Sequence, residues 1–240
     1  MINKNSKTNG FTIAETLITL GIIGIIVSMT LPAIINSSKN KELEVLLNKN
    51  YSLLQQTLLR IYMEEGIAIV AENYTREDIK RLFINNIKGL RNCQGCGAVN
   101  EDNDNNTGTI YTISGYRTLN NKKVNANYLD DAILQFDDGR RLFIERPNQN
   151  ADLPDGYGGG KDQFFISIDI NGFQNRPNRW GADLFTFMVM PDGKLLPMGS
   201  KETKFSEDTY CSAASTSKYN GIGCTYKALT EKDYFKNIPK

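Results

Sequence analysis

The chain has 240 residues with 28 basic and 27 acidic side chains, a formal net charge of +1, and no histidine. The near balance argues against a nucleic-acid-binding protein, which usually carries a basic surplus. Lys122-Lys123 and Arg140-Arg141 are small basic pairs, which predicts solvated faces rather than a basic stripe. Without histidine there can be no Ser-His-Asp or Cys-His site, no HExxH zinc protease and no histidine-ligated metal. The composition therefore favours a structural or binding protein over an enzyme.

The N-terminal segment has the strongest pattern. A short polar leader with Lys4 and Lys7 precedes residues 11–35, in which Glu15 is the sole charged side chain. The uncharged stretch 16–35 would form a helix about 30 Å long, which matches the hydrocarbon core of a bilayer. A secretory signal peptide has a small-residue cleavage site after its apolar region, and none follows here. We therefore expect a retained membrane-spanning helix with its N-terminus in the cytoplasm.

The residues around Glu15 carry a specific motif. A carboxylate at the edge of a hydrophobic segment either stays near the headgroups or needs a positive partner. The sequence GFTIAE at 10–15 resembles the type IV prepilin signal, which type IV pilins and type II secretion pseudopilins share. The resemblance implies that prepilin peptidase cuts between Gly10 and Phe11 and methylates the Phe11 amine. It also implies that Glu15 pairs with this amine of a neighbouring subunit. Ala14 departs from the larger aliphatic residues that are commoner in the family.

The resemblance also implies a function and a location. The chain would be a structural subunit of a filament and not an enzyme, with no resident cofactor. Its partners would be other pilin or pseudopilin subunits, the prepilin peptidase, an inner-membrane assembly platform and the lipid bilayer, with no nucleic acid. It would span a bacterial inner membrane and assemble into a periplasmic or surface filament, and Pro32 would kink its helix. The alternative is a membrane-anchored extracellular enzyme or binding module with an uncleaved anchor.

Residues 36–66 predict an amphipathic continuation of the same helix. Its apolar residues are spaced by 4, 3, 4 and 3 positions, which is typical of one helical face. They are Leu47, Tyr51, Leu54, Leu58 and Ile61, extended by Leu43 and Tyr62. Gly66 is the expected stop. The chain would then divide into a leader (1–10), a transmembrane and assembly helix (11–35), this continuation (36–66) and an exported head (67–240).

The head predicts a helix followed by antiparallel strands. Thr75 is the expected N-cap of the helix. Its core-facing residues are expected to be Ile79, Leu82, Phe83 and Ile87. Strands are expected at residues 109–114, 132–136, 140–145, 163–170, 184–190 and 194–196. Asp138-Gly139 and Asp192-Gly193 are typical of hairpin turns. The predicted fold class is α+β, with a long helix packed on an antiparallel sheet, and the resemblance makes it pilin-like.

Residues 169–187 resemble a stretch found in many pseudopilin heads, which favours the secretion branch of the family. Some members bind calcium there, so the resemblance makes Asp169, Asn171 and Asp183 candidate calcium ligands. Calcium takes about 6–8 oxygens, and only these three residues are visible. The sequence Asp-x-Asn-Gly is also an ordinary turn, which is the simpler interpretation.

The cysteines Cys93, Cys96, Cys211 and Cys224 allow three disulfide connectivities if the head meets an oxidising compartment. The resemblance implies a Cys211–Cys224 bond, since a C-terminal disulfide closes a loop in many pilins. Cys93 and Cys96 could bond to each other, or each could bond to one of the two C-terminal cysteines. A four-cysteine zinc site fits poorly because 12 residues separate the second pair. A thioredoxin-type site also fits poorly, because this CxxC follows a predicted helix.

Overall fold

The computed structural model describes residues 10, 12–70, 73–93, 115–125, 128–146 and 164–238. The chain divides into two compact units, residues 1–41 and 42–240. Helix α1 (Ile13–Glu65) begins in the first unit and continues into the second.

Helix α1 is one continuous element of 53 residues. It ends where the sequence predicts, because Gly66 follows with a left-handed φ of +74° and its N–H donates to Tyr62 O at 2.9 Å. Pro32 lies inside the helix, where it provides no N–H for the preceding turn, and a kink at this position stays a prediction. Among the described residues, α1 is the one helix long and apolar enough to span a membrane.

The C-terminal half of α1 packs on the sheet through one face. Its buried residues are Leu47, Asn50, Leu54, Thr57, Leu58 and Ile61. These include four of the five residues of the predicted stripe, and the fifth, Tyr51, is half-buried with its ring stacked 5.2 Å from Phe187. Leu43 is partly buried against the same core. The extension to Tyr62 is wrong, because its side chain is 51% exposed. Tyr62 lies about 100° around the helix from the fully buried Ile61.

Helix α2 (Arg76–Asn86) begins with the predicted N-cap. The Asp78 N–H donates to Thr75 Oγ1 at 3.2 Å, and the Thr75 N–H donates back to Asp78 Oδ2 at 3.2 Å. This reciprocal pair is a capping box. The four predicted core residues of this segment are all buried.

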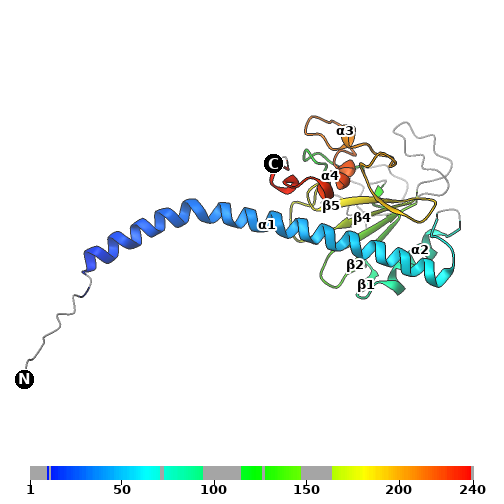
Figure 1. The fold of residues 1–240 in the computed structure, drawn as a ribbon, viewed down its shortest axis with the longest axis horizontal. Coiled ribbons are helices and arrows are strands. Elements are labelled where there is room, and N and C mark those ends of the chain that lie inside the picture. The colour runs from blue at the N-terminus through cyan, green and yellow to red at the C-terminus, as the bar shows by residue number, and fades with distance from the viewer. Residues whose placement is uncertain are drawn as a thin grey trace, which may run out of the picture. The chain divides into compact units, whose positions relative to one another are not determined.

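The sheet has six antiparallel strands in the order β1-β2-β3-β4-β5-β6 (Figure 1). They are β1 (Leu90–Asn92), β2 (Ala132–Phe136), β3 (Arg141–Glu145), β4 (Phe164–Asp169), β5 (Leu184–Val189) and β6 (Leu195–Pro197). The last five match predicted strands, so the α+β class with an antiparallel sheet is confirmed. The sequence reading missed β1, and the strand expected at 109–114 lies outside the described residues.

Short helices follow the sheet, and the sequence reading missed all of them. They are α3 (Glu207–Tyr210), η2 (Ile222–Cys224), α4 (Thr225–Thr230) and η3 (Tyr234–Lys236). None exceeds six residues, which is too short for a clear helical period.

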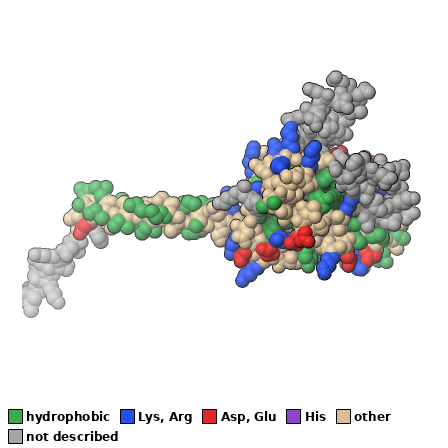
Figure 2. Space-filling model, turned by 90° about the horizontal axis from the view of Figure 1, so that it is seen from above, with side chains coloured by type: hydrophobic (Ala, Val, Ile, Leu, Met, Phe, Trp, Pro, Cys, Tyr) green, Lys and Arg blue, Asp and Glu red, His purple; other side chains and the backbone are tan. Residues whose placement is uncertain are grey.

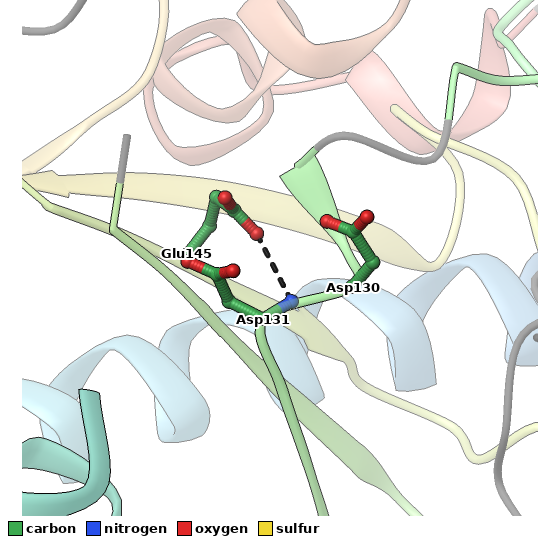
Figure 3. Close-up of side chains that lie close together, drawn as sticks. All are labelled: Asp130, Asp131 and Glu145. Carbon is green, nitrogen blue, oxygen red and sulfur yellow. Dashed lines mark hydrogen bonds between the residues drawn. The ribbon is translucent and has the colours of Figure 1, made fainter. Parts of the chain in front are cut away.

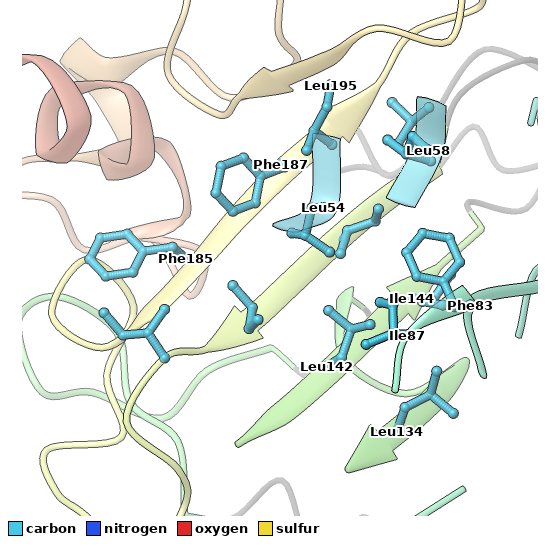
Figure 4. Close-up of a cluster of buried hydrophobic side chains, with 14 of the residues drawn as sticks. Leu54, Leu58, Phe83, Ile87, Leu134, Leu142, Ile144, Phe185, Phe187 and Leu195 are labelled. Carbon is cyan, nitrogen blue, oxygen red and sulfur yellow. The ribbon is translucent and has the colours of Figure 1, made fainter. Parts of the chain in front are cut away.

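Both faces of the sheet are buried. On one face, Leu54 and Leu58 of α1 and Phe83 of α2 pack against strand residues such as Leu142 and Phe187 (Figure 4). On the other face a second core forms. It contains Tyr116, Tyr128, Phe165, Trp180, Phe205 and Tyr219, among others. Every residue of β4 is therefore buried, including the two polar ones that alternate with its isoleucines.

Candidate functional site

The predicted assembly residue Glu15 caps the start of its own helix. Its Oε2 accepts hydrogen bonds from the Thr12 N–H at 2.8 Å and from the Thr12 hydroxyl at 2.8 Å. The Glu15 N–H donates back to Thr12 Oγ1 at 3.3 Å. This is a capping box, and the spacing Thr12-x-x-Glu15 is its sequence signature, which the sequence reading overlooked. Gly10 is exposed, and Phe11 lies outside the described residues.

The apolar part of α1 makes no buried contact within the described chain. Every residue from Ile13 to Ile35 is exposed, with exposed fractions as high as 81% at Ile13. Isolated exposed leucines are ordinary, but a continuous apolar surface of this length needs a lipid or protein environment. The segment therefore provides a surface for a membrane, for other helices, or for both in turn.

The candidate calcium ligands lie together in the second core. Asp169 and Asp183 are fully buried. The Tyr116 hydroxyl donates to Asp169 Oδ2 at 2.7 Å, and the Gly172 N–H donates to Asp169 Oδ1 at 2.8 Å. Gly172 has a φ of +87°, which suits glycine in the predicted Asp-x-Asn-Gly turn.

Asp183 is held in the same way. Its Oδ1 accepts from the Arg179 N–H at 2.6 Å, and its Oδ2 accepts from the Asn178 N–H at 2.7 Å. Each of the four carboxylate oxygens of the two aspartates thus has a donor from the chain. This arrangement favours the turn interpretation over a calcium site. Asn171 Oδ1 is buried without a hydrogen-bond partner, and one such oxygen falls well short of a calcium shell.

Burial changes the protonation of these two aspartates. Desolvation raises the pKa of Asp169 to about 7, and the charge of Asp183 adds to the effect. Desolvation also raises the pKa of Asp183 to about 6, against the lowering effect of its backbone donors. Two buried carboxyl groups this close cannot both ionise easily, so the pair titrates near neutral pH.

Three further acidic side chains gather where β2 meets β3: Asp130, Asp131 and Glu145 (Figure 3). Their nearest oxygens lie within 4.8 Å of one another. The Asp131 N–H donates to Glu145 Oε2 at 3.2 Å, the Arg146 N–H donates to Asp131 Oδ2 at 2.9 Å, and Arg76 forms an ion pair with Asp131. Burial raises the pKa of Asp130, and the charge of Asp131 adds to the rise. Donors of the chain itself therefore bond two members of this cluster, Asp131 and Glu145.

The cysteines form disulfides. Cys211 and Cys224 are bonded, with their Cα atoms 4.8 Å apart, which is the pairing that the family resemblance implies. Cys93 is also disulfide-bonded, while Cys96 lies outside the described residues. A zinc site built from all four cysteines is excluded, because a thiolate ligand cannot be part of a disulfide.

A groove of about 500 Å³ runs between the end of α1 and the β5–β6 hairpin. Its apolar walls include Tyr51, Leu58, Leu59, Tyr62, Ile69 and Leu195. The surface beside it is also apolar, because Leu59, Met63 and Ile67 are 58%, 76% and 49% exposed. The second unit therefore has an exposed apolar surface of its own at the end of α1.

Comparison with known proteins identifies no relative: no protein-family model, curated protein or solved structure matches this chain. Three features of the chain itself bear on its function: the prepilin-like motif, the capped and exposed apolar helix, and the head.

Proposed function

We propose that the chain is a structural subunit of a type IV pilus-like or type II secretion pseudopilus filament, with a role in protein secretion. The observation that carries the proposal is a single helix that begins within the prepilin-like motif GFTIAE and is exposed over residues 13–35, where Glu15 is the sole charged side chain. The subunit is cut by prepilin peptidase after Gly10, methylated on Phe11 and held in the inner membrane until it assembles.

Assembly moves the apolar segment from lipid into contact with other helices. Lipid tails are as apolar as leucine, so this transfer has little hydrophobic driving force. Close packing and charge pairing must therefore contribute most of the specificity. The subunits join in a heterologous helical array, which is the open symmetry that produces filaments. The exposed apolar residues beside the groove at the end of α1 offer a further contact for neighbouring subunits.

Glu15 supplies the charge pair in this proposal. A carboxylate accepts hydrogen bonds at both oxygens, and both contacts with Thr12 use Oε2. Oε1 has no donor among the described residues, so it is available to the amine of a neighbouring subunit. A free α-amine has a pKa of about 8 and is largely protonated at neutral pH. The same side chain can thus cap its own helix and receive the neighbour's charge.

The experiment separates these two roles of Glu15. Glu15→Gln keeps a capping-box residue and removes the charge, whereas Glu15→Ala removes both. Glu42→Ala is the matched control, since Glu42 is an exposed glutamate further along α1. We expect both Glu15 variants to insert and be processed but to stay out of filaments, while Glu42→Ala assembles. Normal incorporation of Glu15→Gln would show that the charge pair is unnecessary. An uncut N-terminus in the parent protein would instead favour a membrane-anchored enzyme or binding module.

A further inference from the structure

Residues 36–41 of α1, which we call the connecting segment, lie between two parts of the helix with different partners. Before them, the apolar segment ends at Ile35, and Figure 2 shows hydrophobic side chains along it. After them, Leu43 is the first apolar side chain of α1 to pack on the core of the head. The connecting segment itself has the sequence NSSKNK, with no apolar residue, and the first compact unit of the chain ends with it at Lys41. Neither lipid nor the sheet therefore supports these residues.

The polar side chains of the connecting segment are not tied to the helix backbone. Residues 36–39 are exposed, and the asparagine and serine side chains of the segment form no hydrogen bond within the described part of the chain. Polar side chains on both sides of it do form such bonds. The Thr30 hydroxyl donates to Ile26 O at 3.0 Å, and the Asn48 amide donates to Glu44 O at 2.8 Å. The free side chains can instead compete with the backbone for its hydrogen-bonding groups.

The residue types of the connecting segment weaken the helix further. Four of the six residues are serine or asparagine, which stabilise a helix less than alanine does. Pro32, one turn before the connecting segment, provides no N–H for the helix. Most helical stability in proteins comes from the packing of one helical face, and a short stretch without packing is marginal in water. The connecting segment should therefore open at a lower free energy than either neighbouring part of α1.

We propose that the connecting segment is a hinge, at which α1 opens locally and lets the head turn relative to the membrane-spanning residues. Its neighbours stay helical, because lipid or other helices surround one and the sheet holds the other. A subunit that moves from a bilayer into a filament needs such freedom, since its head meets new neighbours while its apolar helix is repacked. This use of the hinge rests on the proposed function, whereas the hinge itself would serve any membrane-anchored head.

Hydrogen–deuterium exchange of the full chain in lipid nanodiscs tests the local opening. The backbone amides of residues 36–41 should have protection factors at least about tenfold below those of residues 50–61, which pack on the sheet. Equal protection of the two ranges would overturn the proposal, because the connecting segment would then be as stable as the packed helix.

The variant Ser37→Ala/Ser38→Ala/Asn40→Ala stiffens the hinge and keeps both of its lysines. Its three alanines favour the helix, so the protection factors of residues 36–41 should rise about tenfold. The matched control, Asn48→Ala/Ser52→Ala, changes the same residue types at exposed positions of the packed half and should leave these protection factors unchanged. Equal effects of the two variants would show that the helix opens as a whole, contrary to a hinge.

Spin labels test whether the opening turns the head. Met29→Cys/Lys88→Cys places one label at an exposed position in each compact unit. The distribution of distances between these labels should be broad in the parent and narrower in the stiffened variant. Lys49→Cys/Lys88→Cys, with both labels in the second unit, should give a narrow distribution in each. Equal widths for the first label pair in the parent and in the stiffened variant would overturn the hinge, and normal cleavage after Gly10 would then leave the proposed filament role standing.

Discussion

The substitution Asp169→Asn should remove most of the pH dependence of stability between pH 5 and 7. The folded-state pKa of Asp169 is about 7, against an ordinary value of 3.8. Between these values the folded chain holds a proton that the unfolded chain has lost, so the free energy of unfolding falls as pH rises. From pH 5 to 7 the loss is about 2 kcal/mol for Asp169. Asp183, with a pKa of about 6, adds about 1 kcal/mol.

The chain is well suited to this measurement. It has no histidine, so no imidazole titrates between pH 5 and 8 to obscure the effect of the two aspartates. Its single tryptophan, Trp180, is fully buried in the segment between Asp169 and Asp183, so its fluorescence reports unfolding. Urea unfolding of the full chain in detergent at several pH values would give the free energies.

Asp192→Asn is the control for this prediction. Asp192 is exposed, and its hydrogen bonds with Lys194 lower its pKa. Protonation of Asp192 therefore changes the free energy of unfolding at acid pH, below the range measured here. Its variant should keep the parent's slope between pH 5 and 7. Equal losses of unfolding free energy in Asp169→Asn and in the parent between pH 5 and 7 would refute this role of Asp169.

Three substitutions test the packing, the capping and the cross-link of the head. Leu54→Ala should cost about 2–5 kcal/mol of unfolding free energy, because Leu54 is fully buried where α1 packs on the sheet. Val45→Ala, on the exposed side of α1, should cost little. Equal costs would contradict the assignment of the buried face of α1. Thr75→Ala should cost about 0.5–2 kcal/mol by removing the α2 cap, which urea titration would detect, and an unchanged midpoint would show that the cap adds nothing. Cys211→Ser should cost about 2–4 kcal/mol of unfolding free energy. Reducing agent also breaks the disulfide of Cys93, so it should lower the thermal midpoint of the variant less than that of the parent, and an equal drop would show that Cys211–Cys224 is not the stabilising bond.

Local signals made much of the fold predictable. The Asp-Gly pairs mark hairpin turns, and the strands beside them form the expected neighbours. The capping pattern at Thr75 located the start of α2. Strand β1 was missed because it has three residues and pairs with β2 more than 40 positions away, as in Leu90 with Phe136.

The second core was not predictable in this way. Tyr116, Phe205 and Tyr219 come from segments without periodicity, and only the folded chain brings them to one face of the sheet. The acidic cluster could have been found from the hairpin. The register that pairs Ala132 with Ile144 continues outward to place Asp131 beside Glu145.

Glu15 has one role in the motif and another in the structure. The sequence pattern links Glu15 to assembly through a family resemblance. The geometry gives it a local role, because its carboxylate completes a capping box with Thr12. Both roles can hold at once, since the cap occupies one carboxylate oxygen.

The mass of the intact chain purified from membranes tests the central claim most directly. We expect Met1–Gly10 to be absent and the new N-terminal residue, Phe11, to carry one added methyl group. A chain that keeps Met1, or that begins at any other residue, would contradict the proposal that it is a processed filament subunit.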